Sequence, residues 1–261
     1  MYPHHARAVA RLVAELGDDA RYLALLVGGS IAKGRERPDS DVDLVLVVTD
    51  DEFARHEAAG TMQYLNTEIA DWAGGYVEGK RVPLRFLEEV ADHGSEPARS
   101  AFQGASVGFS HLPELEALLA LIPVYPEADR AAKMASFYAQ VEVLTWYVPE
   151  AEKRGDAYLL AWAASNLSLF AGRLILAHNR ILFPFHKWFM YEVRHAPDQP
   201  VEFLPRLDAL LGHPTAASAE ALRDSIAGFQ DWGLTRRQAF ARYIVETEWS
   251  WRTGPPALID S

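Results

Sequence analysis

The spacing of hydrophobic and polar positions changes near residue 113, and this change separates two sets of predicted elements. Before it, short runs rich in Val and Leu alternate with stretches of helical spacing. The predicted strands cover residues 22–27, 41–49, 76–82 and 104–109. The predicted helices of this part cover residues 5–17, 52–73 and 86–93. Strands interleaved with helices favour a small mixed β-sheet with flanking helices.

Beyond residue 113 only helical spacing remains. The predicted helices cover residues 115–121, 129–147, 156–178, 186–195 and 217–251. Six of the seven tryptophans lie in this half, and aromatic residues on such helices more often belong to a core than to a ligand platform. We predict an α+β fold class, with a sheet domain at residues 1–112 followed by an all-α helical-bundle domain at residues 113–261.

Composition narrows the classes of function. The 261 residues include no cysteine, which excludes disulfides and thiolate metal sites. The net charge of −11 argues against broad binding to DNA or RNA and would attract a cationic small molecule. The chain has no apolar signal-peptide stretch near residue 1 and no uninterrupted apolar run of the roughly 18 residues that cross a membrane. We expect a cytoplasmic protein with no DNA or membrane partner, as a monomer or a homodimer.

Two acidic residues open the most apolar predicted strand. Asp41 and Asp43 are two positions apart, so their side chains leave the same face of a strand, roughly 6.6 Å apart at Cα. Bare carboxylates this close repel each other, and a divalent cation removes the repulsion. Carboxylate oxygens suit Mg²⁺, and such a pair can bridge two metal ions about 3.5–4 Å apart. The pattern therefore predicts a magnesium site.

A glycine turn precedes the acidic pair. Gly28, Gly29 and Ser30 end the first predicted strand, and glycines let backbone N–H groups approach a phosphate without obstruction by Cβ. Lys33 and Arg35 follow in the polar loop and are candidate phosphate contacts. One loop can thus bind a triphosphate while the next strand binds the metal.

Strand, Gly-Gly-Ser turn, polar loop, Asp-Val-Asp and apolar strand together resemble the signature of the DNA polymerase β-type nucleotidyltransferase superfamily. The likeness is sharp over residues 22–48 and is closest to bacterial antibiotic nucleotidyltransferases, of the aminoglycoside or lincosamide kind, with a helical C-terminal domain. It implies that Asp41 and Asp43 are catalytic ligands of two Mg²⁺ ions. It also implies that Gly29 and Ser30 contact the phosphates of ATP or another NTP.

The superfamily usually adds a third carboxylate from a later strand, as a general base or a metal ligand. Glu78 is the candidate for this catalytic and metal-binding role, because it lies in the predicted strand over residues 76–82. Asp71 and Glu88 are alternatives.

Other residues carry weaker hypotheses. Resembling proteins often have a Pro-x-x-Lys-Trp element in the helical half, which implies that Lys187 binds the triphosphate and Trp188 packs near the base. Arg99 is a further candidate phosphate contact. Arg173 and His178 match the loose Arg-x4-His spacing of HEPN-type ribonucleases, for which a buried, hydrogen-bonded histidine is the alternative. His4 and His5 are expected to lie in a mobile terminus.

Three functions remain open. The first is transfer of a nucleoside monophosphate, AMP from ATP by default, to a hydroxyl of a small, aminoglycoside-like acceptor. The second is modification of a macromolecule, either a protein or a tRNA. The third is a non-catalytic nucleotide-binding module, such as half of a toxin–antitoxin pair.

Overall fold

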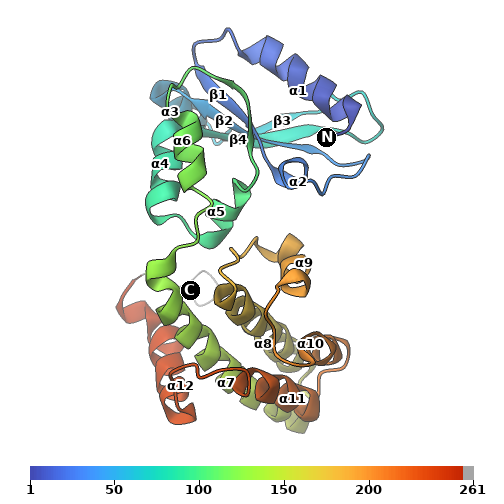
Figure 1. The fold of residues 1–261 in the computed structure, drawn as a ribbon, viewed down its shortest axis with the longest axis vertical. Helices are drawn as coiled ribbons and strands as arrows, with labels where there is room; N and C mark the ends of the chain where they lie inside the picture. Colours follow the sequence, from blue (N-terminus) through green and yellow to red (C-terminus); the bar gives the residue numbers. More distant parts are fainter. Residues whose placement is uncertain (255–261) are drawn as a thin grey trace. The chain divides into compact units, whose positions relative to one another are not determined.

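The computed structural model describes residues 1–254, in two compact units (Figure 1). The first unit ends at Val124, later than the boundary predicted after residue 112. The difference arises from helix α6 (Leu115–Leu121), which packs on α4 (Leu84–His93). Leu115 and Leu87 share one buried cluster. A helix expected to open the second domain therefore completes the core of the first.

A mixed five-stranded sheet in the order β3-β4-β2-β1-β5 forms the centre of the first unit. The strands are β1 (Tyr22–Val27), β2 (Val42–Val48), β3 (Gln63–Asn66), β4 (Val77–Pro83) and β5 (Ser106–Ser110). β2 and β4 are parallel, whereas the other neighbouring pairs are antiparallel. Four of these strands, β1, β2, β4 and β5, were predicted. The Val-rich and Leu-rich runs of β1 and β2 are largely buried, whereas β5 is an edge strand of exposed and partly buried residues.

The predicted helix over residues 52–73 is wrong in its second half. α3 (Asp50–Ala58) is capped by Thr49, whose side chain accepts a hydrogen bond from the Glu52 backbone N–H. The helix ends well before residue 73. The chain then turns into the edge strand β3, where Tyr64 is buried and Leu65 is exposed. Four residues give too short an alternation to stand out from the helical pattern around them.

Helices cover both faces of the sheet (Figure 1). α1 (Pro3–Leu16) lies on one face, where Leu12 packs in a buried cluster with Leu44 and Leu46 of β2. α4 and α6 cover the other face, where their apolar residues pack in a buried cluster with Val47 of β2. Alternate residues of β2 therefore point to opposite layers, and Asp43 points away from α1.

Helices are the only regular secondary structure in the described residues of the second unit, 125–254. Its elements are η1 (Glu127–Asp129), α7 (Arg130–Arg154), α8 (Ala157–His178), α9 (His186–His195), α10 (Phe203–Gly212), α11 (Ala216–Ala227), α12 (Arg236–Tyr243), η2 (Ile244–Glu248) and η3 (Ser250–Arg252). α10 was not predicted, nor was α5 (Glu96–Ala101) in the first unit, and the predicted helix over 217–251 is divided. A sheet domain followed by a helical domain confirms the predicted α+β fold class.

α7 and α8 are the longest helices and pack side by side. α7 continues past its predicted end at residue 147 and includes Pro149, because the flanking Val148 and Ala151 are buried in the helical core. Among the residues described, α8 alone has the length and apolar composition to cross a membrane, and half of its most apolar window of 18 residues is buried within the unit.

The first turn of α1 is packed rather than mobile, contrary to the expectation for His4 and His5. His5 is fully buried, and its Nε2 lies 3.1 Å from the Ser40 carbonyl oxygen. Burial lowers the pKa of His5 from 6.5, and the charge of His4 adds to this effect. The unfolded chain therefore binds the His5 proton more tightly than the folded protein does.

Acidification should consequently destabilise the fold. The contribution of neutral His5 is fully present above pH 6.5 and is lost as the pH falls through the lower folded-state pKa. We expect the melting temperature to fall between about pH 7.5 and pH 5.5, and to fall less in His5→Gln. Thermal unfolding followed by circular dichroism measures both profiles. The variant should keep part of the slope, because the pKa of His56 is also lowered by burial; identical slopes would contradict the assignment to His5.

Candidate metal and nucleotide site

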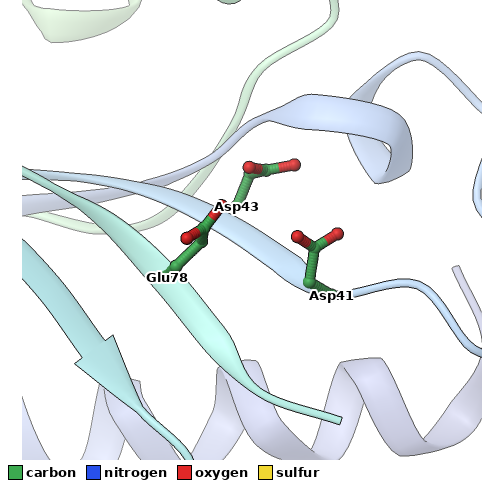
Figure 2. A group of neighbouring side chains, drawn as sticks. All are labelled: Asp41, Asp43 and Glu78. Atoms are coloured by element: carbon green, nitrogen blue, oxygen red, sulfur yellow. The ribbon is translucent and has the colours of Figure 1, made fainter. Parts of the chain in front are cut away.

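Two adjacent parallel strands bring three carboxylates together. Asp43 of β2 lies opposite Glu78 of β4 in the strand register, and Asp41 immediately precedes β2. One ligand oxygen from each residue lies within 4.8 Å of the other two, and all three side chains are partly exposed. Figure 2 shows the three carboxylates gathered at one end of the two strands. Three negative charges this close favour a bound cation.

The donor set fits a hard divalent cation. Carboxylate oxygens are the ligands that Mg²⁺ takes in small number, and it completes its shell with water and phosphate oxygens. Within residues 1–254, no other group of three or more acidic or histidine side chains has this geometry. Of the three candidates for the third acid, the structure places only Glu78 beside the aspartates. Its role as base or ligand remains a prediction.

The two alternatives lie elsewhere. Asp71 accepts hydrogen bonds of 2.9 and 3.1 Å from the guanidinium of Arg7. Glu88 lies on α4 and lines an apolar hollow of about 420 Å³ with residues of α6. The Asp71 carboxylate is therefore paired with Arg7, and Glu88 lies apart from the two aspartates.

The glycine turn touches the carboxylate group directly. α2 (Gly29–Ala32) follows β1, and Gly29 has φ +60°, in the region that glycine enters without strain. A Cβ at Gly29 would overlap the carboxylate of Asp43. The backbone N–H of Gly28 donates to the Asp43 carbonyl oxygen at 2.8 Å. Residue 29 must therefore be glycine for the turn and Asp43 to occupy their present positions.

Lys33 and Arg35, the two basic residues of the loop, each make a hydrogen bond within the first unit. Lys33 donates from Nζ to Oγ of Ser100 at 3.0 Å, and Ser100 is buried in α5. The backbone N–H of Arg35 donates to the Ser30 carbonyl oxygen at 2.8 Å. Gly28 is buried, whereas Gly29 and Ser30 are partly exposed. Contacts of these residues with phosphate remain predictions.

Tyr76 is a site residue that the sequence reasoning missed. A hydrogen bond to the Asp41 carboxylate is the main cause that raises the pKa of Tyr76, and the negative charges of Asp41, Glu78 and Asp43 contribute. The Tyr76 backbone carbonyl also accepts from Val42 at 3.2 Å. A tyrosine before a strand carries no signal of its own, because its partner is set by the pairing of β4 with β2.

The hypothesis that Arg99 reaches phosphate is wrong. Its side chain is buried, with 5% of its surface exposed, and its guanidinium donates to backbone carbonyls at distances of 3.0 to 3.4 Å. The acceptors are the carbonyl oxygens of Ala91, Asp92, Gly94, Ile122 and Val124. Arg99 thus binds the end of α4 to the segment that follows α6.

Arg99→Leu should destabilise the protein by about 3 kcal/mol, because several buried carbonyls lose their donor at once. Urea unfolding of the full chain measures the change in the free energy of unfolding. Arg37→Leu is the matched control, since the exposed Arg37 side chain pairs with the exposed Asp39 and is not buried among carbonyl groups. Equal stability of the two variants would contradict the structural role of Arg99.

The remaining candidate residues all lie in the helical unit. Lys187 is exposed in the first turn of α9, and the ring of Trp188 packs edge-to-face on Tyr191. The guanidinium of Arg173 lies 4.5 Å from each of two phenylalanine rings, and His178 Nε2 lies 2.6 Å from an Asp198 carboxylate oxygen. His178 is thus hydrogen-bonded, as the alternative to a ribonuclease pair expects, although it is partly rather than fully buried. The role of Lys187 remains a prediction.

Comparison with known proteins relates part of the first unit to one protein family. Residues 9–91 match the model of a family described as nucleotidyltransferase domain. This segment contains the glycine turn and all three carboxylates, and the match supports a transferase that uses an NTP and a divalent metal. It covers less than half of the chain.

Among solved structures, the chain matches the nucleotidyltransferase-like protein from Exiguobacterium sibiricum 255-15. The two chains share 10% sequence identity with a TM-score of 0.49, over 94% of this chain and 78% of the other. No curated protein matches the chain.

Proposed function

We propose that the protein is a magnesium-dependent nucleotidyltransferase that moves AMP from ATP to a hydroxyl of a small acceptor. The observation that carries the proposal is the group of three carboxylates within 4.8 Å of one another, in contact with a glycine turn. This arrangement would place a bound cation beside the turn, in which Gly29 and Ser30 are partly exposed. An NTP needs both, because its triphosphate is bound through metal ions and hydrogen-bond donors.

Each residue of the site has a part in the proposed reaction. Asp41, Asp43 and Glu78 would hold two Mg²⁺ ions, which neutralise the charge of the triphosphate and of the pyrophosphate that leaves. The turn at Gly28, Gly29 and Ser30 would orient the phosphates. The acceptor oxygen forms a bond to the α-phosphorus while the bond from that phosphorus to the bridging β-phosphate oxygen breaks. Glu78 accepts the proton of the acceptor hydroxyl.

Further contacts complete the proposal. Lys33, Arg35 and Lys187 are proposed to add positive charge along the triphosphate. The net charge of −11 favours a cationic acceptor of the aminoglycoside kind, although a lincosamide would fit the same class of enzyme. We propose a cytoplasmic protein that acts as a monomer or homodimer and has no DNA or membrane partner.

Isothermal titration of the full chain with each NTP, with and without Mg²⁺, tests the proposal. We expect binding that needs Mg²⁺ and is tightest for ATP. Pyrophosphate release with a panel of aminoglycosides and lincosamides then identifies the acceptor. The proposal fails if no NTP binds in the presence of Mg²⁺. Binding without turnover on any acceptor would favour a macromolecular acceptor or a nucleotide-binding module.

A further inference from the structure

Two histidines in the first turn of α1 reach the loop that ends at Asp41. Nε2 of His4 lies 3.0 Å from the Pro38 carbonyl oxygen, and Nε2 of His5 lies 3.1 Å from the Ser40 carbonyl oxygen. The Ser40 carbonyl and the Asp41 N–H belong to one planar peptide group. A hydrogen bond to this carbonyl therefore fixes the plane from which the Asp41 side chain departs.

Helix α1 also contacts the segment that leads to β4. Arg7 binds Asp71 through two hydrogen bonds, and Arg11 donates to the Ile69 carbonyl oxygen at 3.1 Å. The rings of His4 and His5 each lie 5.1 Å from the ring of Trp72. This segment continues into Tyr76 and Glu78. The N-terminal part of α1 thus joins the two chain segments that deliver the carboxylates.

The chemistry of His5 shows why a histidine stands at this position. A carbonyl oxygen only accepts, so His5 Nε2 carries the hydrogen and Nδ1 of the neutral ring does not. Nδ1 is buried and has no hydrogen-bond partner in the described part of the chain. A buried nitrogen without a partner is unfavourable, and an apolar side chain would fill the same space without it. The donor to Ser40 is therefore the feature that the apolar alternative lacks.

We propose that His5 is a positioning residue for the metal site, acting through the Ser40–Asp41 peptide group to aim the Asp41 carboxylate at Asp43 and Glu78. This inference rests on the proposed function, because it assumes that the three carboxylates bind a cation. His5 itself touches neither metal nor substrate. Its loss leaves all three ligands in the chain but frees the peptide plane at Asp41.

Mn²⁺ affinity of the full chain tests the inference, measured by electron paramagnetic resonance of free Mn²⁺. We expect His5→Leu to weaken binding about tenfold, as the loss of an outer-shell contact typically does. His5→Gln keeps an N–H donor at a similar reach and should restore most of the affinity. A role in stability alone would lower the melting temperature of His5→Leu and leave its Mn²⁺ affinity unchanged.

The outcomes separate this inference from the proposed function. Equal Mn²⁺ affinity of the wild type and His5→Leu overturns the positioning role, provided that Asp43→Asn loses Mn²⁺ binding. Absence of Mn²⁺ binding to the wild type, or unchanged binding to Asp43→Asn, overturns the metal site itself. If His5→Leu does not fold, His5→Asn replaces it, because its amide is one methylene shorter than that of His5→Gln. Equal affinities of His5→Asn and His5→Gln then overturn the positioning role.

Discussion

Replacing Asp43 with asparagine should lower nucleotidyl transfer by about a thousandfold while the fold remains intact. Metal ions contribute several kcal/mol to a transfer of this kind, and each 1.4 kcal/mol corresponds to about a factor of ten in rate. Asp43 lies between the glycine turn and Glu78, so its charge is central to the site. Pyrophosphate release with Mg²⁺, ATP and the acceptor found in the panel measures the loss.

Asp39→Asn is the matched control for this experiment. Asp39 precedes the site by two residues, is exposed and pairs with Arg37, so its replacement should leave the rate unchanged. Without a metal ion, Asp43→Asn should melt at the same temperature as the wild type or a higher one, because repulsion among the three carboxylates is reduced. A loss of activity equal in both variants would show that the effect is not specific to the carboxylate group.

Gly29→Ala should abolish Mn²⁺ binding and destabilise the protein more than any other glycine substitution in this loop. The added Cβ would overlap the Asp43 carboxylate, so either the turn or the aspartate must move. The positive φ of Gly29 adds about 1 kcal/mol of strain. Urea unfolding measures the stability, and electron paramagnetic resonance of free Mn²⁺ measures the binding.

Gly34→Ala separates the two effects. Gly34 has φ +63°, close to the +60° of Gly29, but a Cβ there meets nothing within 4 Å. Gly34→Ala should therefore show the backbone strain of about 1 kcal/mol and retain Mn²⁺ binding. If Gly29→Ala also retained Mn²⁺ binding, the close packing of Asp43 on the turn would not be needed for the cation site.

The acidic pair could be found from the sequence because its geometry is local. Asp41 and Asp43 share a face through strand alternation alone, and the apolar residues after them mark the strand. The position of Glu78 depends on the parallel register between β2 and β4, which no single segment determines. The strand that carries Glu78 could be predicted from the sequence. The closeness of its carboxylate to Asp43 could not, because it follows from the pairing of the two strands in the sheet.

The features that escaped prediction depend on tertiary partners. Arg99 has the appearance of a free cation in the sequence, and only folding brings five backbone carbonyls around it. His5 resembles part of a loose terminus until α1 docks on the sheet. The first unit extends beyond the predicted boundary because α6 packs its apolar residues on α4. The pattern of residues along the chain shows only local periodicity, whereas these contacts join residues that are far apart in the sequence.

The three neighbouring carboxylates at the ends of two strands serve the proposed function but lower the stability of the metal-free fold. The uncomplexed protein holds like charges within 4.8 Å of one another, an arrangement that a sequence selected only for heat resistance would discard. Neutral substitutions there would make a sturdier but inert protein. A divalent ion reverses this conflict, since whatever binds the native state alone also protects it from unfolding. A cation bound there would thus become a component of conformational stability, and chelation would then weaken the native state as well as stop the proposed transfer.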